Sequence, residues 1–73
     1  MQKLVIGGIY QHYKGHKYKV LFLAKHSETL EELVVYECLY ENPKGKIWIR
    51  PKEMFLENVI KDAKTFPRFK FVE

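Results

Sequence analysis

The fold is decided by residues 17–40, KYKVLFLAKHSETLEELVVYECLY. Two runs in which apolar and polar residues alternate flank the polar loop His26-Ser27-Glu28-Thr29. A period of two places alternate side chains on one face of an extended chain, so each run predicts a β-strand. Because the loop is short, we expect the strands over residues 17–26 and 32–40 to form an antiparallel hairpin.

One register of this hairpin brings the apolar faces of both strands together. With residues 27–31 as the connection, Phe22 lies opposite Tyr36 and Val20 opposite Cys38. A slip of one residue would turn the apolar set toward solvent, so the register is specified. The residues that we expect to be buried together are Tyr18, Val20, Phe22 and Ala24 on one strand and Val34, Tyr36 and Cys38 on the other.

Turn signals extend the pattern on both sides of the hairpin. Upstream, residues 9–14 predict a short strand, and Gly15 supplies the positive φ of a tight turn. Downstream, residues 42–45, Asn-Pro-Lys-Gly, fit a type I turn with Pro at its second position. A strand over residues 46–50 follows this turn.

The last third of the chain predicts a helical turn and one more strand. Pro51 can begin a helix, and residues 51–58 predict a short helical turn that lays Met54 and Phe55 on the sheet. Residues 62–64 predict a loop, and residues 66–72 predict the last strand.

Five short strands, tight connections and one short helical turn predict an all-β fold, a small antiparallel SH3-like barrel. An oligonucleotide-binding-type barrel is the less favoured alternative, because its strands and loops are longer. We expect a single domain over residues 1–73, since a chain of 73 residues supports one small core.

Charge is unevenly distributed along the chain, which carries a net charge of +4. Residues 1–25 hold five lysines and no acid, whereas residues 26–41 hold five glutamates and no base. If these blocks form neighbouring strands, opposite charges face each other and much of the basic excess is cancelled. The pattern therefore argues against an unbroken basic surface for nucleic acid.

Compartment is predicted from hydropathy and cysteine content. No apolar run approaches the roughly 18 residues of a membrane span, and we expect no signal peptide at the start of the sequence. The single cysteine, Cys38, cannot form an internal disulfide. We therefore expect a cytoplasmic protein without a membrane partner.

Several short blocks follow one another along the chain in an order that can be compared with known families. They are His12-Tyr13-Lys14-Gly15, His26-Ser27-Glu28-Thr29, Trp48-Ile49-Arg50-Pro51 and Pro67-Arg68-Phe69, with further matches between them. The set resembles a small bacterial family of domains of unknown function, over roughly residues 7–71. The resemblance implies an all-β, barrel-like fold and brings no activity, cofactor or substrate. Ala63 departs from the Gly expected in that family, which puts the turn before the last strand in doubt.

A candidate site lies at one pole of the predicted barrel. In a strand meander, His26 and Arg50 end their strands at the same pole, so the His26–Thr29 loop could converge with Arg50. In one interpretation Arg50 binds a carboxylate or phosphate, His26 and Glu28 form a titrating pair, and Trp48 offers a stacking face.

The alternative interpretation of the same residues is a structural corner. A carboxylate of Glu28 or Glu32 would then bond Arg50, and Ser27 and Thr29 would bond loop amides. Residues 29–32 also fit a capping box in which Thr29 caps one helical turn. The sequence leaves both interpretations open.

Other reactive side chains carry weaker signals. His12 and His16 have the spacing of helical metal ligands, but Gly15 and the strand pattern argue against a helix there. We expect no metal and no cofactor. Cys38 falls on the inward face and is expected to be a buried structural thiol.

Together these patterns favour a non-catalytic binding module for an anionic small molecule or a peptide. The predicted ligand-binding residues are His26, Ser27, Glu28, Thr29, Trp48, Arg50 and Arg68. A barrel that binds RNA or DNA is the alternative. A small hydrolase-like enzyme built on His26 and Glu28 is a weaker one, because no nucleophile or metal set accompanies them.

Overall fold

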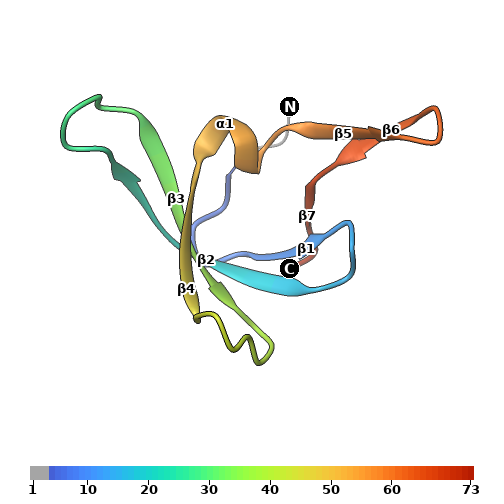
Figure 1. Cartoon of the computed structure of the whole chain (residues 1–73), viewed down its shortest axis with the longest axis horizontal. Coiled ribbons are helices and arrows are strands. Elements are labelled where there is room, and N and C mark those ends of the chain that lie inside the picture. The colour runs from blue at the N-terminus through green and yellow to red at the C-terminus, as the bar shows by residue number, and fades with distance from the viewer. Residues whose placement is uncertain (1–3) are drawn as a thin grey trace.

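The computed structural model describes residues 4–73, which form two antiparallel sheets and one short helix (Figure 1). The elements are β1 (Ile9–His12), β2 (Lys17–Lys25), β3 (Glu32–Cys38), β4 (Ile47–Pro51), α1 (Lys52–Phe55), β5 (Asn58–Lys61), β6 (Lys64–Pro67) and β7 (Phe69–Phe71). The larger sheet has the order β4-β3-β2-β1-β7, and β5 pairs with β6 in a separate hairpin. The predicted all-β class is confirmed.

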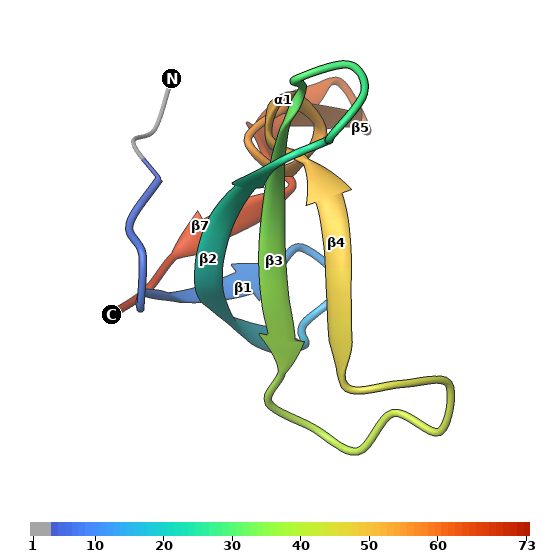
Figure 2. The same cartoon turned by 90° about the vertical axis from the view of Figure 1, so that its left-hand side faces the viewer.

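The larger sheet is strongly bent, and β4 and β7 form its two edges. β2, β3 and β4 lie side by side, while β1 and β7 run across their direction (Figure 2). β7 pairs with β1 although it comes last in the chain, so the end of the sequence returns to its beginning. β4 and β7 are the two ends of the sheet order and do not pair with each other. The structure therefore contains no closed barrel in residues 4–73, and the SH3-like barrel is not confirmed.

The predicted register of the central hairpin is wrong by one residue next to the loop, where Ala24 lies opposite Leu33, and a bulge makes the error two residues at Val20. Val20 lies opposite Tyr36 and Phe22 opposite Val35, so the register shifts between Val20 and Phe22. An extra residue in one strand reverses which side chains face inward beyond it. Val20 is buried as expected, but Phe22 is 64% exposed and Ala24 is also exposed. Strict alternation along β2 could not reveal the bulge.

The core lies between the inner face of the bent sheet and α1. Its buried members are Tyr10, Val20, Val34, Tyr36, Cys38, Phe55, Leu56 and Phe69. The rings of Phe55 and Phe69 stack at 4.1 Å between centroids, which joins the helix to the last strand. The predicted helical turn is present but shorter, and Met54 remains 47% exposed instead of packing on the sheet.

A hairpin replaces the loop that we expected before the last strand. β5 and β6 pair across a two-residue turn in which Asp62 and Ala63 have φ of 53° and 62°. Positive φ at both central residues is typical of the type I′ turn, where Gly is favoured at the second position. Ala63, which stands where the resemblance leads us to expect Gly, therefore lies at the turn position where a side chain is most strained.

The remaining turns follow the sequence signals. Gly15 has a φ of 113°, and its N–H donates to the carbonyl oxygen of His12 at 2.7 Å. In the β3–β4 connection, the N–H of Gly45 donates to the carbonyl oxygen of Asn42 at 3.2 Å, as the predicted type I turn requires. Within residues 4–73 no helix is long and apolar enough to cross a membrane.

Candidate functional site

The His26–Thr29 loop uses its polar groups within itself. The Nδ1 atom of His26 accepts hydrogen bonds from the N–H of Glu28 at 3.1 Å and of Thr29 at 3.4 Å. The hydroxyl of Thr29 accepts from the N–H of Glu31 at 3.2 Å. β3 begins at Glu32, so no helical turn follows Thr29 and the capping box is not formed. The loop is a self-bonded corner, with His26 in the role expected of Ser27.

Arg50 does not join this corner. Along β4 the exposed Ile47 and Ile49 alternate with the partly buried Trp48 and Arg50, which therefore share the inner face. The guanidinium carbon of Arg50 lies 5.4 Å from the ring centroid of Phe69. The structure brings Arg50 to the last strand instead of the His26–Thr29 loop, because the sheet bends until its inner face meets β7.

The two carboxylates of β3 are paired with other cations. Glu32 forms an ion pair with Lys52 at 3.5 Å, and Glu37 pairs with Lys46 at 3.1 Å. Among residues 4–73 no Asp or Glu lies within ion-pair distance of Arg50. The expected clasp between Arg50 and Glu28 or Glu32 is therefore absent.

Trp48 and Arg68, the other two predicted ligand-binding residues, both have partners. The indole N–H of Trp48 donates to the carbonyl oxygen of Gly45 at 3.1 Å, which ties it to the β3–β4 turn. Arg68 donates to one carboxylate oxygen of Glu57 through Nη2 at 2.8 Å and Nε at 3.2 Å. Arg68 thus has a carboxylate partner, whereas Arg50 has none in the described chain.

His12 is the residue that sequence reasoning missed. Its ring packs edge-on against Phe69 at 4.9 Å and stacks on Tyr13. Burial lowers the pKa of His12, and the positive charges of Arg50 and Arg68 lower it further. The Nδ1 atom accepts the N–H of Lys14 at 3.1 Å, so a neutral ring carries its proton on Nε2.

The candidate site is therefore a basic-aromatic cluster formed by His12, Arg50, Arg68 and Phe69. Its members come from β1, β4, β7 and the β6–β7 connection. Three of them, His12, Arg68 and Phe69, belong to the short blocks at residues 12–15 and 67–69. The pairing of β1 with β7 that brings these blocks together is not encoded by local periodicity. A guanidinium and a neutral imidazole N–H are both hydrogen-bond donors, so the cluster has the chemistry that an anion requires.

A second polar cluster, formed by His16, Tyr18 and Tyr40, lies at the start of β2, away from the His26–Thr29 loop. The hydroxyls of Tyr18 and Tyr40 are 3.0 Å apart, and the ring of Tyr40 stacks on His16 at 3.9 Å. Burial raises the pKa of Tyr18, and the hydrogen bond with Tyr40 raises it further. These contacts fasten the chain after β3 to the start of β2, and both hydroxyls are used in doing so.

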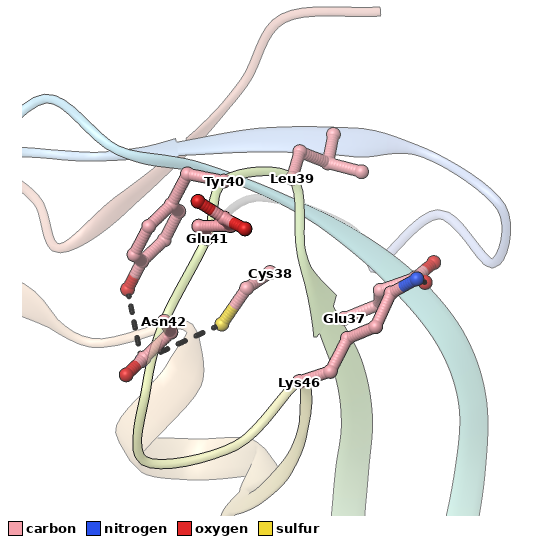
Figure 3. A pocket seen from close by; sticks show the side chains of 7 residues that line it. All are labelled: Glu37, Cys38, Leu39, Tyr40, Glu41, Asn42 and Lys46. Atoms are coloured by element: carbon pink, nitrogen blue, oxygen red, sulfur yellow. Dashed lines mark hydrogen bonds and ion pairs between the residues drawn. The ribbon is translucent and has the colours of Figure 1, made fainter.

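A hollow of about 510 Å³ lies beside the β3–β4 connection (Figure 3). Its lining is Glu37, Cys38, Leu39, Tyr40, Glu41, Asn42 and Lys46. Cys38 is 3% exposed, and its thiol donates to the carbonyl oxygen of Gly45 at 3.9 Å and accepts from the side-chain amide of Asn42 at 3.8 Å. The expectation of a buried thiol is confirmed. Among residues 4–73 no group of three His, Cys, Asp or Glu side chains could hold a metal ion.

Comparisons with known proteins show which chains share this architecture. The family described as "Protein of unknown function (DUF1653)" matches residues 8–71. The chain is also similar to a protein of this family from Bordetella bronchiseptica with a crystal structure, at 39% sequence identity and a TM-score of 0.87. The alignment covers 99% of this chain and 91% of that one. No curated protein matches the chain.

Proposed function

The chain belongs to the DUF1653 family of proteins of unknown function, and we propose that it is a non-catalytic module that binds an anionic small molecule or an acidic peptide. The observation that carries this proposal is Arg50. It is partly buried, stacks over Phe69, and has no carboxylate partner in residues 4–73. A cation held without its own counter-ion favours an anion supplied from outside.

The neighbours of Arg50 support an anion at this position. His12 stays neutral near pH 7 because burial and the surrounding cations lower its pKa, so its Nε2–H remains a donor. An arriving anion would favour the charged form of the ring and raise that pKa again. The buried ring of Phe69 packs against the Arg50 guanidinium and limits the orientations of that side chain.

The charge pattern of the sheet favours a small anion or acidic peptide over nucleic acid. Lys19 lies opposite Glu37 and Lys25 opposite Glu32, so the basic and acidic blocks do face each other across β2 and β3. Together with the ion pairs of Lys46 and Lys52, this pairing interrupts any basic stripe along the sheet. The lone buried thiol agrees with the cytoplasmic location that we also propose.

The test is a titration of the ¹⁵N-labelled protein with inorganic phosphate and with succinate, followed by NMR at constant ionic strength. We expect shifts at the Arg50 side chain and the His12 ring, and a ligand-dependent rise in Tm. Arg50→Gln should abolish both responses. Lys64→Gln, an exposed residue at the β5–β6 turn that loses the same charge, should leave them unchanged.

Two results would contradict the proposal. Responses of Arg50→Gln equal to those of the wild-type protein would place the anion elsewhere. Binding of an RNA or DNA oligonucleotide with a Kd near about 10⁻⁸ M at physiological salt would instead identify a nucleic-acid module.

A further inference from the structure

β4 is an edge strand whose outer main-chain groups have no strand partner in residues 4–73. It pairs with β3, and the sheet order ends at β4. The N–H of Cys38 donates to the carbonyl oxygen of Lys46 at 2.9 Å, which fixes the phase of this antiparallel ladder. Hydrogen-bonded pairs then recur at every second residue, at Trp48 and Arg50. The main-chain groups of Ile47 and Ile49 therefore point away from the sheet.

The position of Pro51 is consistent with this alternation of inward and outward main-chain groups. It lies two residues beyond Ile49, at a position whose nitrogen also points outward and where no N–H is needed for the ladder with β3. None of the turn, loop and cap hydrogen bonds in residues 4–73 uses the N–H of Ile47 or Ile49. Two donors on adjacent outward positions thus remain open to a further strand.

Exposed apolar side chains accompany these open groups. Ile47 is 52% exposed and Ile49 is 62% exposed. On the same outer face, Ile49 lies opposite Val35 and Val35 lies opposite Phe22, which is 64% exposed. The row forms an apolar strip that reaches the free edge of the sheet. An unprotected edge with apolar side chains is the usual template for strand addition.

Charge decides which strand this edge can accept. A second copy would pair symmetrically, with Ile49 opposite Ile49, Ile47 opposite Ile49 or Ile47 opposite Ile47. These three registers set Lys46 opposite Lys52, Lys46 opposite Arg50 and Lys44 opposite Arg50, in that order. Like charges directly opposite each other destabilise a strand pair, so all three registers disfavour self-pairing. A strand with acidic residues at these positions meets cations instead.

We infer that β4 takes up an extended acidic peptide as an added antiparallel strand, an inference that rests on the proposed function. The carboxylate of the peptide faces Arg50 on the inner face, and its alternate apolar side chains lie over Ile47 and Ile49 on the outer face. Antiparallel addition would match the sheet, in which all neighbouring strands pair antiparallel.

The probe is the capped peptide Ac-VEVEVE-NH2, titrated into the ¹⁵N-labelled protein. We expect the amides of Ile47 and Ile49 to shift and their hydrogen exchange to slow. Ile49→Pro removes an outward N–H that the ladder with β3 does not use, and it should weaken binding about tenfold. Ile49→Val keeps that N–H and should bind within about twofold of the wild-type protein.

Methylated peptides test the same hydrogen bonds without altering the protein, in case Ile49→Pro fails to fold. Directly opposite residues share a face, so the valines lie opposite Ile47 and Ile49 and point their N–H groups at β4. Methylation of the valine nitrogens should abolish binding, whereas methylation of the glutamate nitrogens should preserve it. Equal binding of both methylated peptides would overturn strand addition.

The outcomes also separate this inference from the function beneath it. Loss of binding in Arg50→Gln but not in Ile49→Pro would overturn strand addition and leave the anion site. Loss in Ile49→Pro but not in Arg50→Gln would overturn the anion site. Equal binding of Ac-VKVKVK-NH2 would overturn the acidic class of partner. A concentration-dependent dimer that shifts the Ile47 and Ile49 amides without peptide would identify a second copy as the occupant and overturn the inference.

Discussion

The His26–Thr29 loop and the surroundings of Arg50 are both polar, but they differ in how their hydrogen-bonding groups are used. In the loop, His26 Nδ1 and the Thr29 hydroxyl accept main-chain N–H groups of the same loop. Around Arg50 a cation rests on an aromatic ring without a carboxylate in residues 4–73. The difference teaches that side chains of a dense polar motif can be used by its own backbone, while an isolated cation elsewhere has no acidic partner in the described chain.

Removal of the ring beneath Arg50 should have the largest effect. Phe69 is 1% exposed and stacks on Phe55, so Phe69→Ala should cost about 3–5 kcal/mol and unfold a domain this small. Phe22→Ala serves as the matched control, since Phe22 is exposed and should cost less than about 0.5 kcal/mol. Urea unfolding measures both. A greater loss for Phe22→Ala would reinstate the register without a bulge.

The structural role of the loop is tested at His26. His26→Ala leaves the amides of Glu28 and Thr29 without their side-chain acceptor and should cost about 1 kcal/mol. His26→Asn restores an acceptor oxygen of short reach and should recover most of that loss. Neither variant should alter the phosphate response of Arg50. A phosphate response lost in His26→Asn would show that the loop belongs to the binding site.

Backbone strain in the loop predicts a small gain in stability. Leu30 is 67% exposed and has a φ of 63°, a conformation that favours Gly. Leu30→Gly should raise the free energy of unfolding by about 0.5 kcal/mol, after the entropy cost of Gly is subtracted. Ala63→Gly in the β5–β6 turn should change stability in the same direction. Destabilisation of Leu30→Gly alone would reveal a packing role for the leucine side chain.

The smallest expected effect is a pH dependence that belongs to the cluster around Arg50. The pKa of His12 lies below its ordinary value of 6.5, because burial and the charges of Arg50, Arg68, Lys14 and His16 disfavour the protonated ring. Below about pH 6.5 the unfolded chain therefore binds more protons than the folded one, and the stability falls as the pH falls toward the folded pKa.

The measurement is the midpoint of urea unfolding at about pH 7 and at about pH 5. His12→Asn keeps an acceptor for the Lys14 amide and removes the titration, so it should lose less stability over this interval than the wild-type protein. Equal losses in the two proteins would contradict the lowered pKa of His12.

Local sequence signals determined the strands of the central hairpin and the β3–β4 turn, but they left open whether the His26–Thr29 loop is a corner or a pocket. Alternation located β2 and β3, and Asn42 with Gly45 specified the β3–β4 turn, because each signal acts over a few neighbouring residues. The β5–β6 hairpin escaped detection because its two short strands lack alternation and its turn carries Ala63 where Gly is favoured.

Only the tertiary structure decided which residues meet across the molecule. The bulge in β2 turned Phe22 outward, and the pairing of β7 with β1 brought His12, Arg50 and Phe69 together. These outcomes depend on closing a chain of nearly sixty residues (from His12 to Phe69) and on packing the aromatic core, which no local period encodes. The sequence itself determined that a fixed cation was present at Arg50, and the bend of the sheet determined that it would lie beside a ring and not beside an acid.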